Sequence, residues 1–144
     1  MLHGVEIMTF LVQSTNNSTG LGLDPGDTLF IAPSVLIAAA NAIGVYSSYS
    51  GNINNYGTVT GVYGGIKFVQ IGVYGRLYNG ESGIIDGGPL GYDAVNISGP
   101  SDTVNYGQIK STGGDGVSVN AFGSSASVLN FGSIYGSDAV NDLS

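Results

Sequence analysis

The chain has 144 residues, of which 42% are hydrophobic and 9% are charged. This length suits a single domain, and so many apolar residues with so few charges argue against intrinsic disorder. The formal net charge is −7, with only 3 Lys and Arg residues, so binding to nucleic acid or to an anionic membrane surface is not expected. The sequence contains no Cys, which excludes disulfide bonds and thiolate metal sites.

The first 23 residues lack the repeat that organises the rest of the chain. Residues 8–13 (Met-Thr-Phe-Leu-Val-Gln) are predicted to form a strand, and residues 16–20 a polar loop. We expect residues 1–23 to form an N-terminal cap or an irregular first coil. The opening residues lack the basic segment of a cleavable signal peptide.

A turn is predicted at residues 24–27 (Asp-Pro-Gly-Asp), because Pro fixes φ and Gly tolerates a positive φ. It precedes the one long apolar stretch of the chain, residues 28–45. This stretch contains Pro33, Ser34 and Asn41 and has no flanking Lys or Arg. We therefore expect buried strands here and no membrane insertion.

A repeat of about 25 residues occupies the chain from residue 52 onwards. Its first half has the form Asn-x-Gly-x-Ile/Val and occurs at residues 55–59, 105–109 and 130–134, with a longer copy at 79–85. Its second half, with alternating apolar residues, occurs at residues 65–68, 93–97, 115–119 and 138–140. We therefore predict an all-β fold, a right-handed parallel β-solenoid (β-helix) of about five coils of ~24 residues each, with residues 24–144 forming the repeats of a single domain.

The alternation of side chains along a strand predicts which residues face the interior. In the first clear repeat these residues are Ile53, Asn55, Gly57 and Val59. The third repeat is expected to depart from this pattern, because Val104 is out of phase with Asn105. In the second half of the repeat the predicted interior pairs are Ile66/Phe68, Val95/Ile97 and Val117/Val119.

One interior column consists of four Asn residues, namely Asn55, Asn79, Asn105 and Asn130. An amide is both a donor and an acceptor, so stacked Asn side chains can hydrogen-bond along the solenoid axis. We interpret this column as a structural ladder, with ligand binding by the amides as the alternative.

Three carboxylates recur at one corner of the predicted coils, namely Asp93, Asp115 and Asp138. Stacked carboxylates repel one another, and a hard cation such as Ca²⁺ would relieve the repulsion. The alternative is that each Asp caps its own turn through the backbone. Ca²⁺ is the only cofactor that this pattern suggests.

An aromatic residue recurs between the Asn and the Gly of the repeat, at Tyr56, Tyr106 and Phe131. Its parity places it on the outer surface of the coil. We expect these rings either to stack along the sheet or to contact a surface glycan or another chain.

An enzyme is not predicted. His3 is the only His and lies outside the repeats, so a Ser-His-Asp arrangement on the solenoid is not expected. Carboxylate pairs could serve glycoside cleavage, but Lys67, Arg76 and Lys110 are the only basic groups that could assist.

The motifs Asn-Tyr-Gly-Thr-Val, Asn-Tyr-Gly-Gln-Ile and Asn-Phe-Gly-Ser-Ile, each followed by Gly-Val or Ala-Val, resemble the repeats of bacterial haemagglutinin-like and autotransporter-like β-helix surface proteins. Residues 9–14 and 26–32 are similar to the start of repeat-rich exoproteins that are exported without an N-terminal signal. The resemblance implies a secreted or surface-attached bacterial protein with an adhesive or structural role.

Two functions are therefore expected. The first is an extracellular structural or adhesive solenoid, and the alternative is a carbohydrate-binding or polysaccharide-cleaving β-helix. After residue 134 the sequence carries no capping helix or charged, Pro-rich stretch. Either the chain is a fragment of a longer solenoid, or its last coil receives the strand of residues 8–13 from another copy, giving a head-to-tail homo-oligomer or filament.

Overall fold

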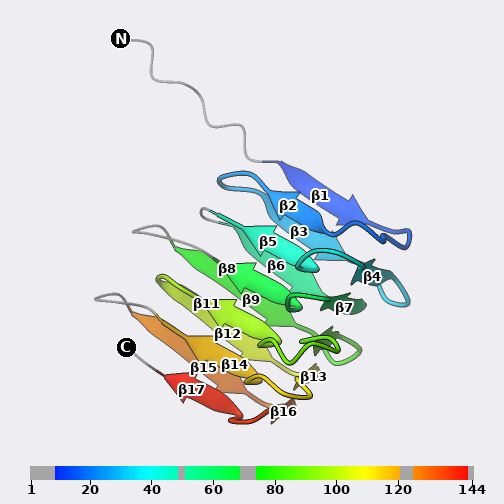
Figure 1. Cartoon of the computed structure of the whole chain (residues 1–144). Helices are drawn as coiled ribbons and strands as arrows, with labels where there is room; N and C mark the ends of the chain where they lie inside the picture. Colours follow the sequence, from blue (N-terminus) through cyan, green and yellow to red (C-terminus); the bar gives the residue numbers. More distant parts are fainter. Residues whose placement is uncertain (1–8, 49–50, 69–73, 121–124, 143–144) are drawn as a thin grey trace.

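The computed structural model describes residues 9–48, 51–68, 74–120 and 125–142, which form strands, turns and bends and no helix (Figure 1). Sheet A contains, in spatial order, β1 (Phe10–Gln13), β3 (Thr28–Ile31), β6 (Asn52–Asn55), β9 (Gly75–Asn79), β12 (Ser101–Asn105) and β15 (Ala126–Asn130). Sheet B contains β4 (Leu36–Ala39), β7 (Thr58–Gly61), β10 (Ile84–Asp86), β13 (Gln108–Lys110) and β16 (Ser133–Tyr135). Sheet C contains β2 (Leu21–Leu23), β5 (Val45–Ser47), β8 (Ile66–Phe68), β11 (Val95–Ile97), β14 (Val117–Val119) and β17 (Val140–Asp142).

The chain visits the three sheets in turn, so each coil adds one strand to each sheet. All strand pairs are parallel, and each strand except those at the two ends of a sheet pairs with the strands of the coils before and after it. Five coils have a strand in every sheet, and the first has β1 and β2 with a single bridge from Asn17 to Ile37 in between. The predicted all-β parallel solenoid of about five coils is confirmed.

The segment before the clear repeats is built as the turn and strand signals predicted. In the turn at residues 24–27, Gly26 has a φ of 81° and the backbone N–H of Asp27 donates to the carbonyl oxygen of Asp24. The apolar stretch of residues 28–45 forms β3, β4 and the start of β5. None of the described residues belongs to a helix that could cross a membrane.

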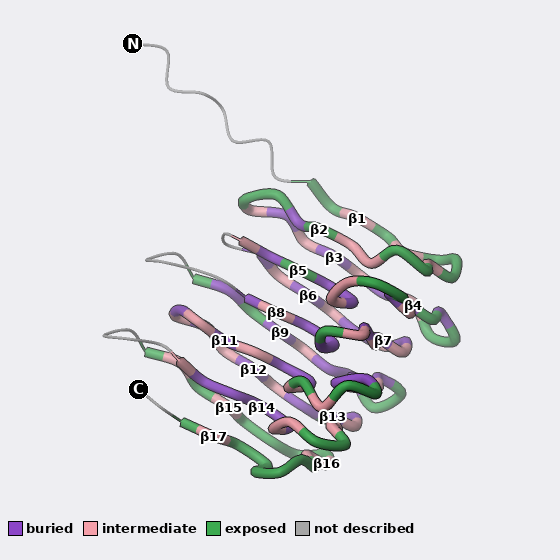
Figure 2. The backbone as a smooth tube through the Cα atoms, in the orientation of Figure 1, coloured by how far each residue is buried: buried purple, intermediate pink, exposed green. Residues whose placement is uncertain are grey.

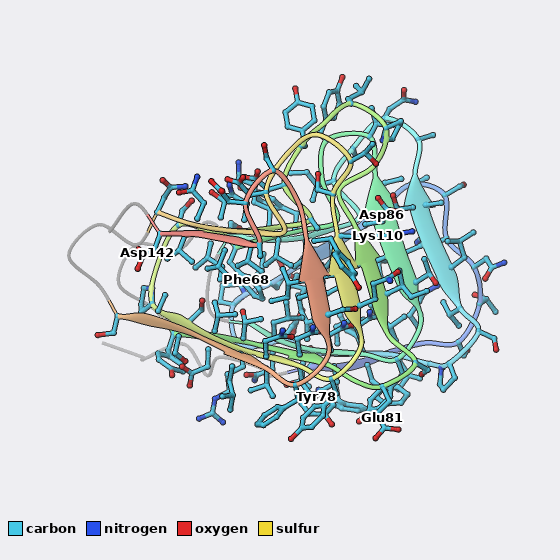
Figure 3. The ribbon with its side chains drawn as sticks, turned by 90° about the horizontal axis from the view of Figure 1, so that it is seen from below. Phe68, Tyr78, Glu81, Asp86, Lys110 and Asp142 are labelled. Atoms are coloured by element: carbon cyan, nitrogen blue, oxygen red, sulfur yellow. The ribbon has the colours of Figure 1, made fainter. Side chains whose placement is uncertain are left out.

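The core is a stack of apolar columns enclosed by the three sheets. In sheet B, Ile37, Val59, Ile85 and Ile109 are aligned by the strand register and fully buried. In sheet C, Phe68 is aligned with Ile97 and points into the interior (Figure 3). The pairs Ile66/Phe68, Val95/Ile97 and Val117/Val119 all face the core, as predicted. Burial is greatest in the middle coils and smallest in the last one (Figure 2).

The third repeat keeps the interior pattern, which corrects the expected departure at Val104. Thr103 occupies the interior position and is fully buried, whereas Val104 is aligned with the outward-facing Tyr78. The sequence analysis missed this because an interior position was expected to be apolar. Polar residues at these positions lower the stability of the fold, because the hydroxyls of Ser101 and Thr103 are buried and have no hydrogen-bond partner among the described residues.

Candidate functional site

Four amides form a row along the solenoid axis, where the strands of sheet A end. Asn55, Asn79 and Asn105 are fully buried. Nδ2 of Asn55 donates to Oδ1 of Asn79 over 2.8 Å, and the same bond joins Asn79 to Asn105 and Asn105 to Asn130 over 2.7 Å. The structure thus places the four residues in the ladder that the repeat predicted.

The amides also bind the backbone of the next coil. Nδ2 of Asn105 lies 3.1 Å from the carbonyl oxygen of Ser133. The Gly of the motif makes room for this close packing, because a Cβ at Gly107 would lie 2.2 Å from the carbonyl oxygen of Gly83. The buried amides are therefore occupied within the solenoid, which supports a structural role over ligand binding.

The Asp column is a set of caps between coils. Oδ1 of Asp93 accepts the backbone N–H of Asp115 over 2.9 Å, and Oδ1 of Asp115 accepts that of Asp138 over 3.1 Å. Oδ2 of Asp93 accepts a hydrogen bond from Nδ2 of Asn96, and Oδ2 of Asp115 accepts one from Nδ2 of Asn141. The capping alternative is thus favoured for Asp93 and Asp115, with the correction that each of these two carboxylates caps the backbone of the next coil and not its own turn.

The same bonds bear on the Ca²⁺ hypothesis for Asp93, Asp115 and Asp138. Both oxygens of Asp93 and both oxygens of Asp115 accept an N–H donor. Among the described residues, no group of three His, Cys, Asp or Glu side chains could hold a metal ion. Asp93 and Asp115 are therefore held in place by backbone and amide N–H groups of the solenoid.

The aromatic column is a continuous ladder of rings on the outer surface. The distances between the centroids of successive rings are 5.4, 5.9, 5.7 and 4.8 Å along the order Phe30, Tyr56, Tyr78, Tyr106 and Phe131. The ladder contains the three predicted rings and supports the stacking interpretation. Tyr78, which points away from the coil interior in Figure 3, lies between two of them.

Sequence analysis missed Phe30 and Tyr78, because neither occupies the position between Asn and Gly. Tyr78 precedes Asn79, and Gly80 stands where the other repeats carry the ring. A Cβ at Gly80 would come within 2.4 Å of the Tyr56 ring. The missing side chain therefore lets the Tyr56 ring lie over the second repeat and meet Tyr78. The available signal was an aromatic residue two positions before a Gly that stands in the place of the ring.

A polar row lies beside the ring ladder on the outer face of sheet A. The strand register aligns Thr28, Asn52, Arg76, Asp102 and Ser127 in this row. Asp102 accepts hydrogen bonds from the hydroxyls of Ser127 and Tyr74, which hold its pKa below the ordinary value. The bond to Asp102 also raises the pKa of Tyr74. Asp102 is therefore ionised and Tyr74 neutral at neutral pH.

The other basic candidates do not join this row. Lys110 lies on sheet B and forms an ion pair with Asp86, with Nζ 3.3 Å from Oδ2 (Figure 3). Lys67 lies on sheet C, aligned with Asn96. His3 falls outside the described residues. The structure thus does not bring the three cationic side chains to one place.

The final coil is the least covered of the described coils. Its strands β15, β16 and β17 are each the last strand of their sheet. Val128 and Ile134 are only partly buried against the coil before them, and Val140 is 43% exposed. Asn130 is exposed, and its Nδ2 turns back to the carbonyl oxygen of Gly132 in its own coil. This coil has the chemistry of a stacking surface without a neighbour in the described part of the chain.

Comparison with known proteins supplies no relative, since no family model, no curated protein and no solved structure matches the chain. The likeness to haemagglutinin-like repeats therefore remains an inference from the repeats alone.

Proposed function

We propose that the protein is an extracellular structural or adhesive element that extends by head-to-tail stacking, with the last coil of one copy meeting the first coil of the next. The observation that carries this proposal is the final coil, where three unpaired strand edges surround a partly exposed apolar surface. Unpaired edges and exposed apolar surface both favour pairing with another chain.

The two ends of the described solenoid complement each other. Continuing the parallel register of sheet A sets Val128 against Leu11 and Asn130 against Gln13 of the next copy. Leu11 and Val128 are both partly buried against their own core, so the junction would bury both further. In sheet C the same step sets Val140 against Leu21.

The amide row supports the same register. Each buried Asn donates to the side-chain oxygen of the next coil, but Asn130 donates only within its own coil. Gln13 stands at the equivalent position of the first coil. Its amide oxygen could accept a hydrogen bond from Nδ2 of Asn130 in the copy before it, as each Asn oxygen does within the row. Because the contact is heterologous, it produces a filament unless the rotation closes a ring.

Mutation of either end tests the proposal. Leu11→Lys and Val128→Lys each place a charge on one stacking surface, so each variant is expected to be monomeric in sedimentation velocity while the intact chain forms concentration-dependent filaments. Each variant keeps one working end, so an equal mixture of the two should form a one-to-one dimer and nothing larger. Added salt should strengthen assembly of the intact chain, because screening weakens repulsion between copies of net charge −7.

The matched control is Leu129→Lys, which changes the neighbouring residue of the same strand. Leu129 is aligned with Val104 and Tyr78 on the outer face, so this variant should assemble like the intact chain. The far-UV spectrum of all variants should stay that of a β-protein. A monomeric intact chain at high concentration and across salt, or filaments of Val128→Lys, would contradict the proposal.

The extracellular, surface-attached part of the proposal is supported by the resemblance of the repeats and by the solenoid fold on which they are built. It is tested separately from assembly. Protease treatment of intact bacteria that produce the tagged chain should remove the tag if the protein is displayed at the surface, and a tag that survives until lysis argues for an internal location.

A further inference from the structure

The outer face of sheet A carries a groove that head-to-tail stacking does not use. It runs across β6, β9 and β12 and has a volume of about 450 Å³, which is within the range of ligand-binding clefts. Its lining includes Asn52, Asn54, Arg76, Tyr78, Asp102 and Val104. These residues come from the middle coils, so both ends of the solenoid remain outside the groove.

One side of the groove is a set of hydrogen-bonding groups. The Arg76 guanidinium lies 5.8 Å from the centre of the Tyr74 ring, and no described residue accepts a hydrogen bond or ion pair from it. The side chain of Asn54 likewise has no hydrogen-bond partner among the described residues, and the side chain of Asn52 uses only its Nδ2, which donates to Thr28. The groove thus offers free donors on Arg76 and free amide groups on the two Asn side chains.

Asp102 supplies a fixed acceptor in the same groove. Its two oxygens accept from Tyr74 and Ser127, which orient the carboxylate and leave each oxygen able to accept a second bond. Asp102 is aligned with Arg76 on the neighbouring strand. The positive charge of the guanidinium offsets the negative charge of the carboxylate beside it. The groove therefore presents both donors and acceptors without a large excess of charge.

The other side of the groove is apolar. Tyr78 and Val104 form it, and they are aligned on adjacent strands. Tyr78 belongs to the ring ladder, which holds its ring between Tyr56 and Tyr106. Burial among these rings, with the neighbouring Tyr56, raises the pKa of Tyr78, so its hydroxyl remains a neutral donor and acceptor at neutral pH.

We propose that this groove binds a neutral saccharide chain. A sugar ring has an apolar C–H face and a rim of hydroxyls that both donate and accept, and these match the Tyr78 and Val104 side and the mixed polar side of the groove. The strands run in parallel from coil to coil, so a chain lying across them would meet a polar group on each of β6, β9 and β12. An acidic polymer fits less well, because Asp102 faces the groove and the net charge is −7.

Titration of the intact chain with soluble oligosaccharides tests this assignment. The probes are the neutral hexasaccharides cellohexaose, maltohexaose and hexa-N-acetylchitohexaose, with hexagalacturonate as the acidic comparison, and the readout is backbone amide shifts by NMR. At least one neutral probe should bind saturably and shift amides of β6, β9 and β12. Arg76→Met should weaken that binding about tenfold, the loss expected for one charge-assisted hydrogen bond.

Lys67→Met is the matched control, since it removes the same charge from an outward-facing position on sheet C. It should leave binding unchanged. Equal losses in Arg76→Met and Lys67→Met, tighter binding of hexagalacturonate, or no binding of any neutral probe at millimolar concentration would overturn the proposal. A change in self-association of Arg76→Met without a change in saccharide binding would instead assign this face to a second copy.

Discussion

The coil of β12, β13 and β14 and the coil of β15, β16 and β17 have the same motif and very different environments. Ile109 is fully buried, whereas the aligned Ile134 is only partly buried. Asn105 is buried in the amide row, whereas Asn130 is exposed. Val117 is 0% exposed and the aligned Val140 is 43% exposed.

The difference shows that the motif alone does not bury its interior side chains. A coil encloses its interior residues only when a coil lies on each side, so stability in this fold depends on the interface between neighbours as much as on the coil itself. The same motif is therefore a core element in the middle of the stack and a stacking surface at its end. The predictions below compare the two coils, from the largest expected effect to the smallest.

The largest difference is expected for the sheet B column. Ile109→Ala should lower the free energy of unfolding by about 2–5 kcal/mol, because it leaves a cavity at a fully buried position. Ile134→Ala should cost about 1 kcal/mol or less in the monomer, since that side chain is partly solvated already. Urea denaturation at low protein concentration measures both, and equal losses would mean that the last coil is covered.

The amide row should show the same contrast at a smaller scale. Asn105→Ala removes bonds to the coils on both sides and is expected to cost about 1–3 kcal/mol. Asn130→Ala removes one bond to the coil before it and one within its own coil, and it should cost about 1 kcal/mol or less because Asn130 is exposed. At protein concentrations that allow assembly, Asn130→Ala should lower the free energy of unfolding by more than it does in the monomer. A loss that does not depend on protein concentration would argue against an amide row that crosses the junction.

Thr103 lies between the two environments, aligned with Leu77 on one side and Val128 on the other. Thr103→Val keeps the shape of the side chain and removes a buried hydroxyl that has no hydrogen-bond partner among the described residues. The variant should therefore be more stable by about 1 kcal/mol. A higher thermal midpoint supports this, whereas a clear loss of stability would show that the hydroxyl is bonded in the folded protein.

The smallest effect is expected from Asp102, whose hydrogen bonds lie at the surface. Its pKa is lowered in the folded state, so its contribution to stability is present above the unfolded pKa and is lost as the pH falls through the folded value. Asp102→Asn should be slightly less stable than the intact chain at neutral pH. The difference between the two proteins should shrink as the pH falls below the ordinary carboxyl pKa, and a difference that grows on acidification would contradict the lowered pKa of Asp102.

The fold could be predicted because the period, the Gly positions and the parity of residues such as Ile53 and Val59 all point to the same coil. The Asn row followed from the same alignment. Thr103 was not predicted, because interior positions were identified by hydrophobicity and the strand register alone places a polar residue there. The sheet C strands β8, β11 and β14 were predicted correctly because their interior pairs are all apolar.

The candidate sites were less predictable, because they depend on neighbours in space. The Asp caps cross from one coil to the next, and no local signal distinguishes this from a cap on the same turn. The groove joins Asn54, Arg76 and Asp102 from three coils, and these residues share no motif in the sequence. The shift of the ring from the position of Gly80 to Tyr78 breaks the repeat itself and is compensated only in the folded ladder.

Native-state hydrogen exchange tests most directly whether a coil is stabilised by its neighbours. At low protein concentration, amides of β7, β10 and β13 should exchange slowly and those of β15, β16 and β17 fast, because only the former lie between two coils. As the concentration rises, β15, β16 and β17 should become protected while the interior strands do not change. Slow exchange of the last coil at every concentration, or fast exchange that assembly does not alter, would contradict the account.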